Sequence, residues 1–223
     1  MTLSSPVVAQ DFDKGVNAFN EGDFAIAYKE LAPLALEGDP KAQAYLGFIH
    51  SDASGDLKDI SKAIYWYGLA AHQGNPYAQV NLALMHEQGK NGFTQDYKAA
   101  GKLYRMAAEQ GHAQAQNNLA SLYFNGHGYR RNYTLALEWY RKAALNGHAY
   151  AFVNLSSIYA QGLGVEVDYV KSYLWALFAD AAGLKEGQFN LSIVEAMLTE
   201  KNKAEANELL LECIKSEMKK CDF

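Results

Sequence analysis

The sequence predicts an all-α solenoid, because one pattern recurs along most of its 223 residues. A glycine returns at intervals of 36, 37, 36 and 36 residues, and a leucine follows each glycine eight positions later. The glycines are Gly38, Gly74, Gly111, Gly147 and Gly183, and the leucines are Leu46, Leu82, Leu119, Leu155 and Leu191. A period of about 20 to 50 residues is typical of stacked helical units, which bury a core only against their neighbours.

Each full repeat begins with a helix, here named helix A. In the second full repeat we expect helix A over residues 77–88, with Ala78, Leu82 and Met85 on one face at steps of four and three. The equivalent stripes are Ala42/Leu46/Ile49, Ala115/Leu119/Leu122 and Ala151/Leu155/Ile158. Residues 11–38 form a shorter first unit, whose turn at 20–23 lacks the longer loop of the later repeats.

A second helix, named helix B, completes each repeat and is expected over residues 135–146 in one of them. Ala136 and Ala143 let neighbouring backbones approach closely, and a large aromatic side chain fills the remaining space. The tryptophans predicted to fill it are Trp66, Trp139 and Trp175. Gly147 then ends helix B in the left-handed conformation, which a side chain would disfavour.

A glycine-rich loop separates helix A from helix B, at residues 126–129 and 162–165. Gly-x-Gly also occurs in phosphate-binding loops, but those follow a strand. Here the pattern follows a helix and recurs with the repeat, so we interpret it as part of the architecture. Asn132 and Asp168, four residues after the second glycine, are expected to cap the N-terminus of helix B.

Together these residues resemble the Sel-1-like repeat, a relative of the tetratricopeptide repeat. The matching pattern is Tyr-x-x-Gly-x-Gly-x-x-x-(Asn/Asp), then Ala-x-x-Trp-Tyr-x-x-Ala-Ala-x-x-Gly and Ala-x-x-Asn-Leu, over about residues 39 to 195. The resemblance implies a right-handed α/α solenoid that binds a protein or peptide in a concave groove. It divides residues 11–223 into a tetratricopeptide-like unit at 11–38, four Sel-1-like units at 39–183, and terminal helices with a cap at 184–223.

Composition argues against several classes of function. The net charge of −5 and the short basic cluster Arg130-Arg131 disfavour nucleic-acid binding. No apolar run is long enough to span a membrane, and the histidines lack the spacing of zinc ligands, so no metal or other cofactor is expected. Ser216 and Lys219 match the Ser-x-x-Lys motif, but its companion motifs Ser-Asp-Asn and Lys-Thr-Gly are missing. A β-lactam-interacting enzyme therefore remains only a remote alternative.

One polar position recurs without an evident packing need. Asparagine precedes the repeat leucine at Asn81, Asn118, Asn154 and Asn190, and Tyr45 takes this place in the first full repeat. Such a side chain projects about 100° from the buried leucine, toward a flank of helix A that can face the groove. An amide both donates and accepts hydrogen bonds, so a row of amides can hold an extended peptide. The alternative is that the amides tie neighbouring helices together.

Cys213 and Cys221 are eight residues apart, the spacing by which cysteine-rich Sel-1-like proteins join one helix B to the next helix A. Within one continuous helix their Cα atoms would lie about 12 Å apart, too far for a disulfide. Pairing therefore requires the helix to end between them, near Ser216. Two free thiols are the alternative.

Residues 1–10 lack a basic segment and a long apolar segment, but Ser5 to Ala9 resemble the end of a secretory signal peptide. We therefore expect a periplasmic or secreted protein; a cytoplasmic protein with an ordinary terminus is the alternative. Exported Sel-1-like proteins include immunity proteins that neutralise effector enzymes of rival bacteria. The sequence thus predicts a non-enzymatic protein-binding module, with an immunity-type inhibitor as the alternative.

Overall fold

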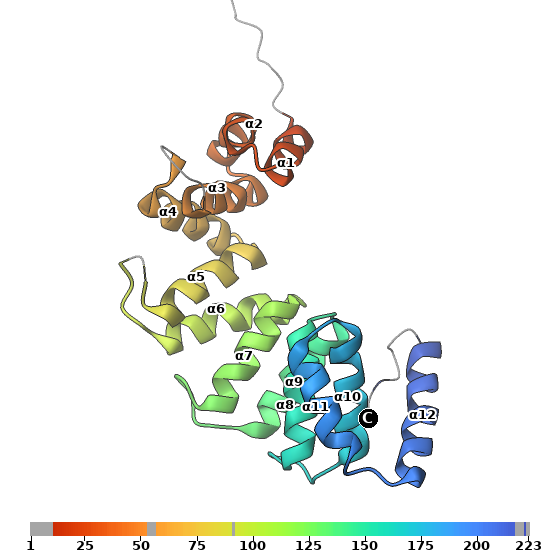
Figure 1. The fold of residues 1–223 in the computed structure, drawn as a ribbon. Helices are drawn as coiled ribbons and strands as arrows, with labels where there is room; N and C mark the ends of the chain where they lie inside the picture. Colours follow the sequence, from red (N-terminus) through yellow and green to blue (C-terminus); the bar gives the residue numbers. More distant parts are fainter. Residues whose placement is uncertain (1–10, 53–56, 91, 217–220, 222–223) are drawn as a thin grey trace, which may run out of the picture. The chain divides into compact units, whose positions relative to one another are not determined.

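The computed structural model describes residues 11–52, 57–90, 92–216 and 221, and these contain twelve helices and no strand (Figure 1). The helices are α1 (Phe12–Asn20), α2 (Phe24–Leu36), α3 (Pro40–Asp52), α4 (Ile60–His72), α5 (Pro76–Gln88), α6 (Tyr97–Glu109), α7 (Ala113–Asn125), α8 (Tyr133–Leu145), α9 (Ala149–Gln161), α10 (Tyr169–Ala181), α11 (Lys185–Glu195) and α12 (Glu200–Lys215). The predicted all-α fold is confirmed. The signal-peptide remnant expected at 1–10 lies outside the described residues.

The helices group into two compact units, residues 1–96 and 97–223. In the first unit, each helix from α1 to α5 packs against the next, and the buried side chains of Leu31, Leu46 and Ile49 belong to its core. In the second unit, α6 to α11 pack in the same sequential way, and α12 packs against α10. Helix A of the repeats corresponds to α3, α5, α7, α9 and α11, and helix B to α4, α6, α8 and α10.

The predicted cap residues of helix B are confirmed, although α8 begins at Tyr133 and ends at Leu145 instead of spanning the expected residues 135–146. After α8, Gly147 has a φ of 82°, and the backbone N–H groups of Gly147 and His148 donate to carbonyls of the last helical turn at 2.9 Å. The other four repeat glycines have φ between 78° and 104°. At the opposite end of helix B, Asn132 and Asp168 each accept a hydrogen bond from the N–H group three residues later. The glycine turn and the cap thus fix the limits of the helix.

The leucine stripe of helix A is fully buried in three of the five repeats. Leu46, Leu119 and Leu155 have no exposed surface, and the alanines four residues before them are equally buried. Leu82 and Leu191 are partly exposed, and the sequence pattern does not distinguish these two leucines from the three buried ones. The periodic stripe therefore forms the core as predicted, but two of its members lie at the margin.

The tryptophans contribute to the packing to different degrees, and Trp66 packs against the core of the first unit although it is partly exposed. Trp66 and Trp139 are partly exposed, because the next residue of helix B takes the core position and neighbours on a helix point about 100° apart. The buried rings are Tyr67, Tyr104 and Tyr140. In α10 the next residue is the small Ala176, and here Trp175 is fully buried and stacks on Phe152 with ring centroids 5.9 Å apart.

A row of buried glutamines, which was not predicted, joins successive hairpins. Gln43, Gln79 and Gln116 lie five residues after a repeat glycine and are at most 3% exposed. Each Nε2 donates to the carbonyl oxygen eight residues earlier, at 3.0, 3.2 and 3.0 Å respectively. These carbonyls belong to the last turns of α2, α4 and α6, and each also accepts from the backbone N–H of the repeat glycine, at 3.0 or 3.1 Å. The glutamine therefore adds a second donor to an acceptor at the end of helix B and ties it to the next helix A.

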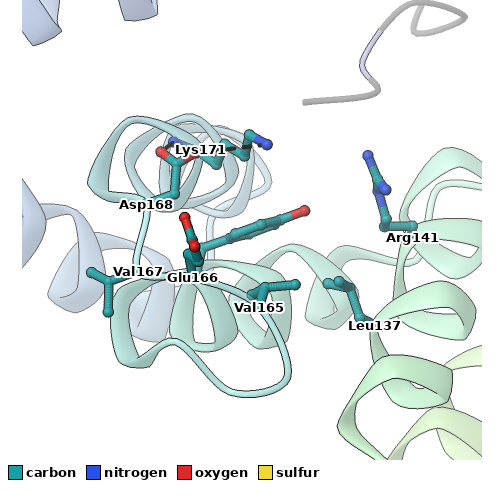
Figure 2. A pocket seen from close by; sticks show the side chains of 8 residues that line it. Leu137, Arg141, Val165, Glu166, Val167, Asp168 and Lys171 are labelled. Carbon is teal, nitrogen blue, oxygen red and sulfur yellow. Dashed lines mark hydrogen bonds and ion pairs between the residues drawn. The ribbon is translucent and has the colours of Figure 1, made fainter.

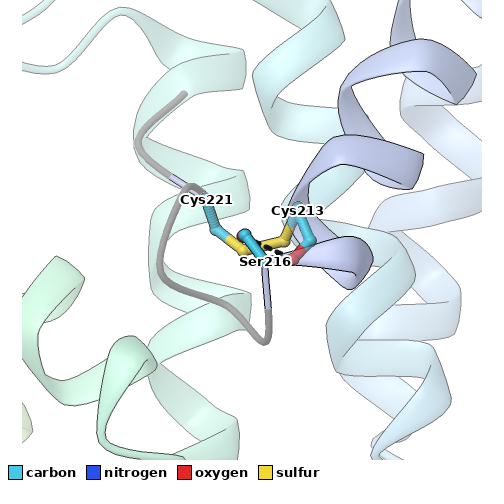
Figure 3. The surroundings of a disulfide bond; sticks show 3 residues. All are labelled: Cys213, Ser216 and Cys221. Carbon is cyan, nitrogen blue, oxygen red and sulfur yellow. Dashed lines mark hydrogen bonds between the residues drawn. A yellow bond between two sulfur atoms is a disulfide. The ribbon is translucent and has the colours of Figure 1, made fainter.

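The C-terminal helix ends between the two cysteines, as their pairing requires. Ser216 caps α12, and its hydroxyl donates to the carbonyl oxygen of Cys213 at 2.8 Å (Figure 3). Cys213 and Cys221 form a disulfide with a Cα–Cα distance of 4.7 Å, and both side chains are buried. Lys219, the second residue of the Ser-x-x-Lys match, lies outside the described residues.

We expect Gln116→Leu to lower the free energy of unfolding by about 1–2 kcal/mol, because the buried carbonyl of Ala108 would lose one of its two donors and Asn146 would lose its acceptor. Gln188→Leu is the matched control, since Gln188 holds the same repeat position in α11 but is exposed. Urea unfolding followed by circular dichroism measures both variants. Equal losses in the two variants would contradict a specific role of the buried hydrogen bond.

We expect the unreduced native protein to yield no free thiol when it is denatured and titrated with Ellman's reagent. Reduction should destabilise the C-terminal segment by about 2–3 kcal/mol, the closure entropy of so short a loop. Hydrogen exchange of α12 with and without reductant measures this loss. The double variant Cys213→Ser/Cys221→Ser should not respond to reductant, and two titratable thiols in the wild type would contradict the disulfide.

Candidate partner-binding surface

Two asparagines of the predicted row, Asn154 and Asn190, connect α7, α9 and α11 in the second unit, and a third, Asn118, lies beside them. Nδ2 of Asn154 donates to Oδ1 of Asn117 at 3.2 Å, and Nδ2 of Asn117 donates to Oδ1 of Asn118 at 3.3 Å. Nδ2 of Asn190 donates to the hydroxyl of Ser157 at 3.2 Å. The bonds of Asn154 and Asn190 join helices one repeat apart, whereas the bond between Asn117 and Asn118 lies within α7. The interhelical tie, which was the alternative to partner binding, is therefore present.

Each of these three amides also keeps one polar group unused. Among the described residues, nothing donates to Oδ1 of Asn154 or Asn190, and Nδ2 of Asn118 has no acceptor. All three side chains are partly exposed. One half of each amide thus holds a fixed orientation through the fold, and the other half can form a hydrogen bond with another molecule.

The two predicted residues of the first unit have different surroundings. Nδ2 of Asn81 donates to the carbonyl oxygen of Tyr77 within its own helix, at 2.9 Å. The ring of Tyr45 packs edge-on against Phe12 and Phe19, with centroid distances of 6.1 and 4.8 Å. Neither side chain makes a bond like those of the second unit, and a partner-binding role for Asn81 and Tyr45 stays a prediction.

Residues one helical turn before the asparagines share their face of helix A. They are Gln114, Tyr150 and Glu186, and all three are exposed; Tyr150 has 53% of its surface accessible. We name the amide face as the set Gln114, Asn117, Asn118, Tyr150, Asn154, Ser157, Glu186 and Asn190. It offers amide and hydroxyl groups, the carboxylate of Glu186 and one aromatic ring, a combination suited to a peptide backbone with an apolar side chain.

His112 and His148 begin α7 and α9. Nδ1 of His112 accepts a hydrogen bond from the N–H of Ala115 at 3.4 Å, but Nδ1 of His148 is buried and has no partner among the described residues. Burial lowers the pKa of both imidazoles, and the proximity of His112 lowers the pKa of His148 further. The folded chain therefore favours the neutral form of His148.

The described residues contain no group of three or more His, Cys, Asp or Glu side chains placed to hold a metal ion. The buried His50 has contacts within the protein: its Nδ1 shares a hydrogen bond with the carbonyl of Leu57 at 2.7 Å, and its ring packs against Tyr28. It is a core residue of the first unit. Among the residues that the structure describes, no helix combines the length and the apolar character needed to cross a bilayer.

Comparisons with known proteins agree with the repeats of the sequence and with the helical fold. Residues 40–75, 76–112, 113–148 and 149–179 each match the model of the Sel1 repeat. The chain is 32% identical to a Sel1 repeat protein from Oxalobacter formigenes, with a TM-score of 0.74 over 81% of this chain and 74% of that one. It is 29% identical to c5321, a protective antigen of uropathogenic Escherichia coli strains that displays an SLR fold, with a TM-score of 0.56 over 85% of this chain and 48% of that one. No curated protein matches.

We expect the stability of the protein to fall as the pH drops from 7.5 to about 5.5. Because the folded pKa of His148 lies below the ordinary pKa of histidine, about 6.5, the unfolded chain binds the proton first, and stability is lost below that pH. His148→Asn, which places a favourable N-cap residue before α9, should reduce this dependence, and adding His112→Asn should reduce it further. Urea midpoints at the two pH values measure the effect. His72→Asn, at an exposed histidine, is the control, and an unchanged slope in the double variant would contradict the assignment.

Proposed function

Because the chain belongs to the Sel1 repeat family, we propose that it is a non-enzymatic module that binds an extended segment of a protein partner along the amide face. Sel1 repeats generally mediate interactions between proteins. The observation that carries the proposal is that Asn118, Asn154 and Asn190 each have one polar group held by the fold and one left open.

The mechanism follows from the fixed orientation of the amides. The open Oδ1 atoms of Asn154 and Asn190 can accept from backbone N–H groups of a peptide, and the open Nδ2 of Asn118 can donate to a backbone carbonyl. These side chains are already ordered, so binding does not have to immobilise them. The exposed ring of Tyr150 adds apolar contact on the same face.

An immunity-type inhibitor of a bacterial effector enzyme is the second candidate. The disulfide of Cys213 and Cys221 favours a periplasmic or secreted location, because disulfides persist in oxidising compartments. The net charge of −5 would favour association with a basic enzyme. An inhibitor would cover a folded enzyme over about 800 Å² on each partner, a wider area than a peptide contacts.

Two isosteric substitutions separate the binding role of the row from its structural role. Asn118→Asp keeps the oxygen that accepts from Asn117 but removes the open Nδ2 donor; Asn154→Asp removes the interhelical donor but keeps the open acceptor. We expect Asn118→Asp to weaken peptide binding by about tenfold with little change in melting temperature. Asn154→Asp should lower the melting temperature and affect binding less. Both variants add the same charge, so each controls for the other.

The probe is a peptide selected from a random phage-displayed library against the whole protein, labelled for fluorescence anisotropy. A folded effector enzyme captured from the source organism tests the inhibitor alternative with the same two variants. Equal binding of the selected peptide by wild type and Asn118→Asp would contradict peptide binding on the amide face. Failure of the library to yield any binder, together with capture of a folded enzyme, would favour the inhibitor.

A further inference from the structure

A cluster of aromatic and cationic side chains packs between α6, α7 and the loop that joins α7 to α8. The guanidinium of Arg105 on α6 donates to the phenol oxygen of Tyr123 on α7, and it lies 5.9 and 6.0 Å from the ring centres of Tyr123 and Tyr129. Tyr129 comes from the loop and packs on Gly101, where a Cβ atom would lie only 2.4 Å from its ring. The ring of Tyr129 thus occupies a space that Gly101 leaves.

The next repeat keeps the polar half of this cluster but lacks the loop ring. Thirty-six residues later, Arg141 replaces Arg105 and Tyr159 replaces Tyr123, so both chemical groups persist. Val165 stands in the place of Tyr129, and Leu137 in the place of Gly101. The leucine restores part of the lost volume, but a pocket of about 340 Å³ remains, lined by these four residues together with Glu166 to Asp168 and Lys171.

The lining of this pocket has two chemical parts. Figure 2 shows Leu137 and Arg141 from α8 on one side, with Asp168 and Lys171 at the start of α10 on the other. Lys171 lies 3.6 Å from the carboxylate of Asp168 and 5.5 Å from the ring centre of the buried Tyr159. Leu137 and Val165 supply apolar surface. The lining is therefore mostly polar and charged, with a smaller apolar part at Leu137 and Val165.

We propose that this pocket receives a tyrosine side chain of the protein partner. A ring in the pocket would contact Leu137 and Val165 and present its face to the cations of Arg141 and Lys171, which aromatic rings attract. A phenol can also donate to a carboxylate such as Glu166 while it accepts from a cation. One repeat earlier, the chain itself places the ring of Tyr129 beside the corresponding Arg105 and Tyr123, with Gly101 in the place of Leu137.

This inference rests on the proposed protein-binding function and specifies one side chain of the partner. The pocket residues come from α8, α9, the loop after α9 and α10, and none of them belongs to the amide face. The two sites can therefore be tested separately. The probe for the pocket is N-acetyl-tyrosinamide, which is too small to report on the amide face.

The experiment is a titration of the whole isotopically labelled protein, followed by NMR of the leucine and valine methyl groups. N-acetyl-tyrosinamide should shift the signals of Leu137 and Val165 with a dissociation constant on the order of 1 mM. Val165→Tyr, which supplies the ring from the chain itself, should weaken binding at least about tenfold. Leu36→Tyr is the control, since it adds a tyrosine at an exposed site in the other unit and should leave binding unchanged.

A second variant keeps the test independent of the folding of Val165→Tyr. Lys171→Met removes one cation but keeps a long apolar side chain, and we expect several-fold weaker binding of the tyrosine probe. Absence of methyl shifts at millimolar probe, or shifts unaffected by both variants, would overturn the proposal. Stronger binding of N-acetyl-aspartamide than of the tyrosine probe would also overturn it, because the site would then recognise an anion. None of these outcomes depends on Asn118 or Asn154.

Discussion

The way in which each helix B ends controls the rest of the structure. A helix leaves its last carbonyl groups without partners, and in stacked hairpins some of these groups are buried. The repeat satisfies them with a left-handed glycine turn and with a glutamine five residues later, as Gln116 does for the carbonyl of Ala108. Because the glutamine belongs to the next helix A, the same hydrogen bond that completes one helix positions the following one.

This requirement also determines which amides remain available to a partner. Gln116 points into the core and bonds to Ala108, and it also accepts from Asn146 at 2.9 Å. Asn118, two positions further along α7, is rotated by about 200° and lies partly exposed on another face. Its single bond to Asn117 orients it without using all of its capacity. The architecture therefore produces both buried structural amides and outward-facing ones.

Features that depend on local backbone chemistry could be predicted from the sequence. The turn at Gly147 and the caps at Asn132 and Asp168 follow from residue type and spacing alone. The glutamine row could not be recognised in this way, because one sequence does not show whether a repeated polar residue is buried or exposed. The available signal was the constant distance of these glutamines from the repeat glycine. Likewise, only packing decides that Tyr140 rather than Trp139 faces the core.

The departures from the repeat differ in whether packing accounts for them. Phe152 holds the glutamine position in α9, and its ring stacks on the buried Trp175, so this substitution extends the core. Val165 in place of a tyrosine is compensated only in part: Leu137 in place of Gly101 refills some of the volume, and about 340 Å³ stays open. Arg141 and Tyr159 persist in the lining of this space, as Arg105 and Tyr123 do beside Tyr129. A ring supplied by a partner would occupy the open space and contact the same kind of cation that the ring of Tyr129 contacts within the chain.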